Sequence, residues 1–312
     1  MKYFKIVASR SAKRYRIDVQ TFKSITDNRY PYVKSDGSTI RRYGICPSCL
    51  NPIQLIGIAR QTEIKPYGKH AGKGIKDLAE WDIIKYRYCP YAIKNYRKHP
   101  EKNTRLPVIT EEVRDLYELL KTQFDRVIYV VSKELNIRCS FLFWRKALQQ
   151  YLLSKMYCYP WLTETNLPYL FAYEGITQKN IYGQSVLVNS DIFHALSKYE
   201  HIRFKPTADN RYVSVISDGT YVKLVFRLTD HRQDIDENGE LIESMRFCID
   251  DIGTISVSDT AGVVCKTLYD KKIIFKESYF MNIIHKYGAY RNRRQDYLNL
   301  AAQMMPPLHL TE

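Results

Sequence analysis

The sequence predicts an α+β protein in three parts, because three segments of the chain show different patterns. Residues 1–105 are strongly basic and contain closely spaced cysteine and histidine residues. In residues 106–200 apolar side chains recur at helical spacing, and in residues 201–312 apolar and polar side chains alternate. We therefore expect an N-terminal metal-binding module, a helical middle region, and a C-terminal antiparallel β-sheet with a terminal helix.

Four residues in the first segment have the spacing of a metal site. Cys46 and Cys49 form a C-x-x-C pair, twenty residues separate Cys49 from His70, and eighteen separate His70 from Cys89. Three thiols and one imidazole complete a tetrahedral ligand set for Zn²⁺, which accepts sulfur and nitrogen alike. We predict one structural Zn²⁺ held by these four side chains. The alternatives are His99 as the fourth ligand, or four unrelated residues without a metal.

The segment around these residues resembles a zinc ribbon. The turn signal Ser35-Asp36-Gly37-Ser38 separates two extended segments, the second leads into Cys46, and the apolar segment Ile53–Ile58 follows Cys49. The resemblance implies a ribbon-like β layout for residues 1–105. A regular zinc ribbon has a second C-x-x-C pair, whereas here the second pair of ligands is divided between His70 and Cys89.

All of the excess positive charge lies in the same segment. Residues 1–105 contain 23 Lys and Arg against 8 Asp and Glu, while the remaining residues contain 25 of each sign. Charge concentrated on one module favours an anionic partner, and nucleic acid is the commonest one. The alternatives are an acidic protein partner and a basic surface that only contacts solvent. The candidate contacts are basic residues with interleaved tyrosines able to stack on bases, namely Arg10, Lys13, Arg14, Tyr15, Arg16, Arg41, Arg42, Tyr96, Arg97 and Lys98.

Helical periodicity predicts the elements of the middle region. Thr110 is a candidate cap for one long helix whose apolar positions run from Val113 to Leu135. A second helix is expected from about Ser140 to Met156, and shorter ones at Leu167–Tyr173 and at Asp191–Tyr199, the latter capped by Ser190. A helix-turn-helix is an alternative interpretation of the two helices on either side of the Pro-containing stretch Cys158–Thr163, but the neutral charge of this region disfavours it.

Alternating apolar residues predict the C-terminal sheet. Tyr212–Ser217 and Tyr221–Leu228 are expected to form a hairpin, and Asn238-Gly239 marks a further turn. Further strands are expected at Met245–Ile249, Thr254–Val257, Val263–Leu268 and Ile273–Glu277, before helices at Tyr279–Lys286 and Tyr297–Met304. Asp250 and Asp251, with Lys271 or Lys272 nearby, provide an alternative function, that of a metal-dependent nuclease.

Several classes of protein are disfavoured. No phosphate-binding loop, dinucleotide-binding fingerprint or nucleophile elbow is present, and the zinc deaminase pattern is absent. No apolar run is long enough to span a membrane, and the N-terminal apolar stretch is too short for a signal peptide. We therefore expect a cytoplasmic, reducing environment in which the other cysteines, Cys139, Cys158, Cys248 and Cys265, are core thiols.

The expected function is thus binding rather than catalysis. A basic module stabilised by Zn²⁺ would bind DNA or RNA, and the neutral C-terminal part would support it or recruit a protein partner. The sequence indicates neither the choice between DNA and RNA nor the oligomeric state.

Overall fold

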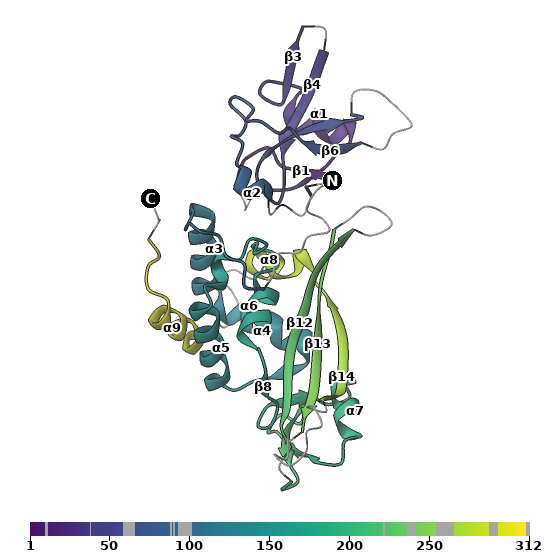
Figure 1. Cartoon of the computed structure of the whole chain (residues 1–312), viewed down its shortest axis with the longest axis vertical. Helices are drawn as coiled ribbons and strands as arrows, with labels where there is room; N and C mark the ends of the chain where they lie inside the picture. Colours follow the sequence, from purple (N-terminus) through teal and green to yellow (C-terminus); the bar gives the residue numbers. More distant parts are fainter. Residues whose placement is uncertain are drawn as a thin grey trace, which may run out of the picture. The chain divides into compact units, whose positions relative to one another are not determined.

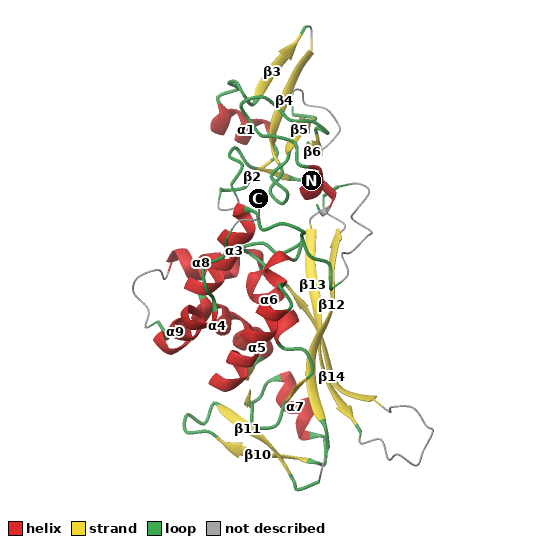
Figure 2. Ribbon diagram, turned by 60° about the vertical axis from the view of Figure 1, so that its left-hand side comes forward, coloured by secondary structure: helices red, strands yellow, loops and turns green. Residues whose placement is uncertain are grey.

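The computed structural model describes residues 1–9, 12–37, 39–58, 66–87, 89, 91–92, 102–220, 222–235, 241–253, 265–286 and 293–309. The chain combines helices with antiparallel sheets, which confirms the predicted α+β class (Figures 1 and 2). It divides into two compact units, Met1–Thr104 with Gln233–Ile242, and Arg105–Arg232 with Glu243–Glu312. The predicted helical region and most of the predicted C-terminal sheet both lie in the second unit.

The first unit is built on a small antiparallel sheet. The strand order is β3-β4-β5-β6, and a two-residue pair, β1 with β2, is joined to β4 through a bridge between Lys5 and Ile45. Phe4 and Phe22 pack under this sheet, and a Cβ at Gly44 would lie 2.8 Å from the Phe4 ring, so only glycine fits there. The elements are β1 (Tyr3–Phe4), β2 (Tyr15–Arg16), α1 (Val19–Thr26), β3 (Val33–Asp36), β4 (Thr39–Ile45), β5 (Pro52–Ile56), β6 (Tyr67–His70) and α2 (Ile83–Arg87).

The second unit packs helices against a long sheet. Helices α3 to α6 gather on one side of the sheet that contains β12, β13 and β14 (Figures 1 and 2). The helices are α3 (Glu111–Thr122), α4 (Phe124–Leu135), α5 (Phe141–Leu153), the 3₁₀ turn η1 (Met156–Cys158), α6 (Leu167–Gly175), α7 (Asp191–Ser197), α8 (Glu277–Lys286) and α9 (Gln295–Met304). The strands are β7 (Ile137–Arg138), β8 (Lys179–Asn180), β9 (Ser185–Leu187), β10 (Ile202–Pro206), β11 (Tyr212–Ser217), β12 (Leu224–Ile235), β13 (Leu241–Ile252) and β14 (Cys265–Ile274).

Aromatic side chains form much of the core between these layers. Phe143 of α5 stacks on Phe226 of β12 with ring centroids 5.6 Å apart, and Phe226 contacts Phe247 of β13 edge-on. Tyr169 of α6 stacks on Phe275 at 4.3 Å. Within the described residues, no helix is both long enough and apolar enough to cross a membrane.

The single long helix predicted from Val113 to Leu135 is two helices. Gln123 leaves the helical region, with φ −121° and ψ 19°, and thereby ends α3 and begins α4. Its carbonyl accepts from the backbone N–H groups of Arg126 and Val127, and its side chain accepts from the Arg126 guanidinium. The apolar spacing does not reveal this break because Phe124, which follows it, is fully buried and continues the apolar row.

The predicted hairpin of residues 212–228 is wrong. β11 pairs with β10 and β9, whereas β12 pairs with β8 and lies next to β13 in a separate sheet. Alternation identified both strands but not their partners, and β11 is already paired on both sides by β10 and β9. The order in the two sheets is β10-β11-β9-β7 and β14-β13-β12-β8.

Two further expectations for this region are corrected. The strands predicted at 263–268 and 273–277 are largely one strand, β14, which pairs with β13 through a register shift at Ile249 and Asp250. Glu277 begins α8 instead of ending a strand. Cys139, Cys158 and Cys248 are buried as expected, but Cys265 at the start of β14 is exposed. The strand predicted at 254–257 and the turn at 238–239 lie outside the described residues.

Candidate metal centre

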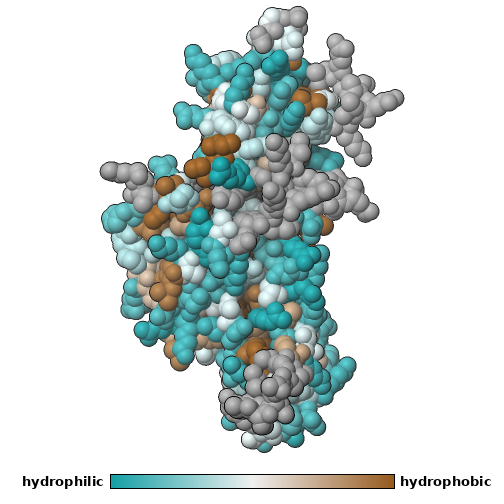
Figure 3. Space-filling model, viewed as in Figure 1, coloured by the Kyte–Doolittle hydropathy of each residue, from teal (hydrophilic) through white to brown (hydrophobic). Residues whose placement is uncertain are grey.

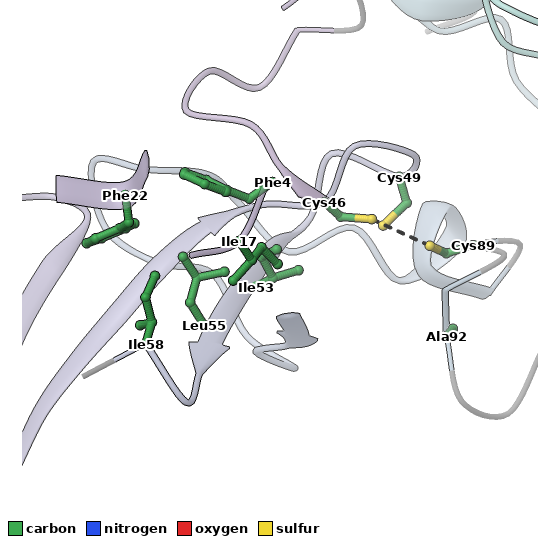
Figure 4. Packing of buried hydrophobic residues seen from close by; sticks show 10 residues of the cluster. All are labelled: Phe4, Ile17, Phe22, Cys46, Cys49, Ile53, Leu55, Ile58, Cys89 and Ala92. Atoms are coloured by element: carbon green, nitrogen blue, oxygen red, sulfur yellow. Dashed lines mark hydrogen bonds between the residues drawn. The ribbon is translucent and has the colours of Figure 1, made fainter. Parts of the chain in front are cut away.

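The C-x-x-C pair lies in a tight turn between β4 and β5. The backbone N–H of Cys46 donates to the carbonyl of Asn51, and the N–H of Leu50 donates back to the carbonyl of Cys46, at 2.8 and 3.1 Å. Leu50 takes a left-handed conformation, φ 59°, which closes the turn. Both sulfur atoms are therefore presented at the end of the sheet, beside the apolar cluster that contains Phe4 and Ile53 (Figure 4).

The other two side chains come from separate elements of the same unit. His70 is the last residue of β6 and lies opposite Ile53 of β5 in the ladder. Cys89 follows α2, and its N–H donates to the Tyr86 carbonyl at 3.0 Å. The Tyr86 ring contacts the His70 imidazole edge-on at 5.0 Å, which restricts the orientation of the imidazole. The sheet and the short helix thus bring three distant parts of the sequence to one point.

Three of the distances between these four side chains are close to the edges of a coordination tetrahedron. The Sγ atoms of Cys46 and Cys89 are 3.7 Å apart, and His70 Nε2 lies 3.3 Å from Cys49 Sγ and 3.6 Å from Cys89 Sγ. Zn–S bonds of about 2.3 Å and Zn–N bonds of about 2.0 Å at tetrahedral angles place neighbouring ligand atoms about 3.5–3.8 Å apart. All four ligand atoms lie within 4.8 Å of one another, so they could hold one metal ion.

Burial makes it unfavourable for these thiols to ionise without a neighbouring cation. Cys46 and Cys89 are almost completely buried, and burial raises the pKa of both thiols well above the ordinary value. Burial also opposes ionisation of Cys49, but hydrogen bonds from the other two thiols and from His70 outweigh it and lower the Cys49 pKa. Burial therefore disfavours three thiolates at this point unless a positive ion offsets their charge.

Asn51 supports the site from behind, and the sequence analysis missed it. Its side chain is buried; Nδ2 donates to Cys49 Sγ at 3.4 Å and to the Asp82 carbonyl at 2.9 Å. Its Oδ1 accepts from the Asp82 N–H at 2.6 Å. Asn51 therefore ties the C-x-x-C turn to the start of α2, which leads to Cys89. Asn51 is one of two polar residues, with Gln54, in the apolar run from Leu50 to Ile58, and the sequence does not distinguish their roles.

The structure describes some, but not all, of the residues predicted to contact nucleic acid. Lys13, Arg14 and Arg16 are exposed beside the partly exposed Tyr15, and the Lys13 ammonium lies over the Tyr15 ring at 5.5 Å. Arg41 and Arg42 are partly exposed on β4. On the face drawn in Figure 3, mostly hydrophilic residues cover the first unit. The remaining candidates lie outside the described residues, namely Arg10, Tyr96, Arg97, Lys98 and the rival ligand His99.

The carboxylates of the alternative nuclease site have other partners. Asp250 is buried, its Oδ2 accepts from Arg227 Nε at 2.6 Å, and its Oδ1 accepts from the Thr267 hydroxyl at 2.8 Å. Asp251 accepts from the Tyr199 hydroxyl at 2.5 Å. Among the residues that the structure describes, the three cysteines and His70 are the only group of three or more metal-ligating side chains that lie close enough together to hold an ion.

Comparison with known proteins gives no relative to draw on. No protein-family model matches the chain, and neither curated proteins nor solved structures include a significant match.

Proposed function

We propose that residues 1–105, the N-terminal module, form a nucleic-acid-binding unit stabilised by one Zn²⁺ ion. The observation that carries the proposal is the set of three thiols and one imidazole at tetrahedral spacing, inside the segment that holds all of the excess positive charge. Soft thiolate ligands in a tetrahedral set favour Zn²⁺ over Mg²⁺ or Ca²⁺, which prefer oxygen ligands.

The ligand set supports a structural role for the metal. Three thiolates and one imidazole fill the four positions of tetrahedral Zn²⁺, whereas a catalytic zinc keeps one position open for water or substrate. The site joins the C-x-x-C turn, the end of β6 and Cys89 beyond α2, at the margin of a small apolar cluster that contains Phe4 and Ile53. In small zinc modules the free energy of zinc binding, about 10–16 kcal/mol, stabilises the folded state. The ion would therefore hold these loops in place.

The charge distribution supports nucleic acid as the partner. Exposed cations, including Lys13, Arg14 and Arg16, surround a module whose acidic residues are few. Lysine and arginine side chains that contact phosphates release condensed counterions, which favours binding and makes it sensitive to salt.

Elemental analysis tests the metal. We expect about one zinc per chain in the wild-type protein and loss of most of it in Cys46→Ser, Cys89→Ser and His70→Ala, because each removes one of four ligands. His99→Ala and the buried-thiol control Cys139→Ser should keep it. Full zinc content in Cys46→Ser and Cys89→Ser would contradict the assignment, and loss in His99→Ala with retention in His70→Ala would transfer the fourth position to His99.

Fluorescence anisotropy tests the partner. Labelled DNA and RNA oligonucleotides should bind the intact protein at low salt, and log Kd should rise steeply with log salt concentration. Removal of zinc with a chelator should weaken binding. Absence of binding to any of these oligonucleotides at low salt would overturn the proposed function.

A further inference from the structure

The outer part of the hairpin β3–β4 is a two-stranded ribbon. Among the described residues, 39–42 of β4 pair only with residues 33–36 of β3, whereas β5 pairs with the following residues, Tyr43 to Ile45. The pairing of β5 with β4 therefore stops at Tyr43, although β5 continues to Ile56 beside β6, and the outer part of the β3–β4 hairpin extends beyond these strands (Figures 1 and 2).

This ribbon carries three cations on two adjacent rungs. Lys34 lies directly opposite Arg41, and Arg42 lies opposite Val33 on the next rung, so cations project from both faces. Like charges directly opposite each other destabilise an antiparallel pair. Within the described part of the chain, neither Arg41 nor Arg42 has an ion-pair partner to offset that repulsion. An anionic ligand would offset it.

The Lys34 ammonium is held in place instead of moving freely in solvent. It donates to the Lys76 carbonyl at 2.8 Å and lies 4.9 Å from the centre of the exposed Tyr30 ring. These contacts hold one positive charge beside the ribbon and lower the entropy lost when a phosphate binds there. On the opposite face, two residues from Arg42, the Ile40 side chain is 58% exposed.

We infer that this ribbon, residues 33–36 with residues 39–42, binds in the major groove of double-stranded DNA. The inference rests on the proposed nucleic-acid function and names its ligand and its surface. The major groove of B-DNA, about 12 Å wide, admits a two-stranded β-ribbon. The deep, narrow major groove of A-form RNA excludes side chains of such an element. With the face that carries Arg42 and Ile40 turned toward the bases, Ile40 would contact the exposed methyl groups of thymine, and the longer Arg42 would reach a phosphate. Lys34 and Arg41, on the other face, would contact phosphates along the walls of the groove.

Competition binding with the intact zinc-loaded protein tests the choice of ligand. The probes are a fluorescein-labelled DNA duplex, an RNA duplex of the same sequence, and the DNA single strand. We expect the DNA duplex to bind at least about tenfold more tightly than either competitor. Methyl green, which occupies the major groove, should displace the protein, whereas the minor-groove ligand distamycin should not. Preference for RNA or single strands, or displacement by distamycin alone, would overturn the inference.

Charge removal on the ribbon tests the surface. Arg41→Gln with Arg42→Gln should weaken duplex binding about tenfold or more and lower the slope of log Kd against log salt by about 1.8 if both contact phosphates. The control Lys23→Gln with Lys73→Gln removes the same charge from exposed positions of the same unit. If both double variants bind alike while the wild-type protein binds DNA, the ribbon assignment fails and the proposed function stands. If the wild-type protein binds no nucleic acid, both fail.

Discussion

The metal centre shows, residue by residue, what local sequence can and cannot predict. Cys46 and Cys49 can be identified as ligands from the sequence, because two ligands three positions apart need only one turn to reach the same ion. His70 and Cys89 can be proposed from the sequence because tetrahedral Zn²⁺ needs two more ligands. Their proximity to Cys46 and Cys49, however, depends on the sheet and on α2. Asn51 could not be predicted, because its role depends on Asp82, which is far away in the sequence but adjacent in the fold.

Protonation of the metal-free site gives a prediction at the same scale. Because burial holds the pKa of Cys46 and Cys89 above the ordinary value while the Cys49 pKa is lowered, two of the three thiols carry protons at pH 7. Zinc must displace both, so binding should release about two protons and the affinity should fall by about two log units for each pH unit below neutrality.

Calorimetry of zinc binding at pH 7 in buffers of different ionisation enthalpy measures this number. Release of about three protons would mean that the metal-free loops unfold and that all three thiols regain their ordinary pKa of about 8.5. Release of none would contradict thiolate ligation. The control Cys139→Ser, far from the four ligands in sequence and in the second unit, should release the same number as the wild-type protein.

At the scale of single elements, the starts of helices were more predictable than the partners of strands. The side chains of Thr110, Ser140 and Ser190 accept from the third N–H of their helices, because capping needs only local contacts. The pairing of β11 with β9 and β10 depends instead on contacts distant in sequence, and alternation gives no information about them. For the same reason the close packing of α5 and α6 cannot be derived from periodicity.

Gly175, at the end of α6, tests that packing. An added Cβ would lie 2.8 Å from the carbonyl oxygen of Ala147 in α5, closer than real Cβ contacts. Alanine usually stabilises a helix relative to glycine by about 0.5–1 kcal/mol, but here the overlap with α5 should reverse the sign. We expect Gly175→Ala to destabilise the protein by about 1–3 kcal/mol and to lower Tm by several degrees.

Thermal unfolding followed by circular dichroism measures the effect. Gly74→Ala is a suitable control, since its added Cβ would meet no atom nearer than 3.5 Å and its φ is not positive. The control should change Tm by no more than about 1 °C. A Tm for Gly175→Ala equal to or above that of the wild-type protein would mean that α5 and α6 separate easily at this point.

At the scale of the whole molecule, the division of charge is the property that the sequence reveals without any structure. The 23 cations and 8 anions of residues 1–105 contrast with the balanced remainder, and the count is independent of how strands pair. In the second unit, several charges instead neutralise one another in the fold. Arg293 binds both carboxylate oxygens of Asp125, and Arg227 binds the buried Asp250. Residues 1–105 are therefore the expected source of the electrostatic field that attracts an anionic partner.

Reversing charge in one unit at a time tests this assignment. Arg14→Glu with Arg16→Glu changes two exposed positions of the N-terminal module, and Lys198→Glu with Lys205→Glu makes the same change in net charge at exposed positions of the second unit. If Arg14 and Arg16 contact phosphates, the first pair should weaken nucleic-acid binding about tenfold or more and lower the salt slope by about 1.8, because two counterion-releasing contacts are lost. The second pair should shift affinity by less than about threefold, since charges that contact no phosphate are screened over about 8–10 Å at physiological salt. Equal weakening by both pairs, measured by anisotropy over a range of salt concentrations, would mean that net charge alone governs binding and that the N-terminal module has no special role.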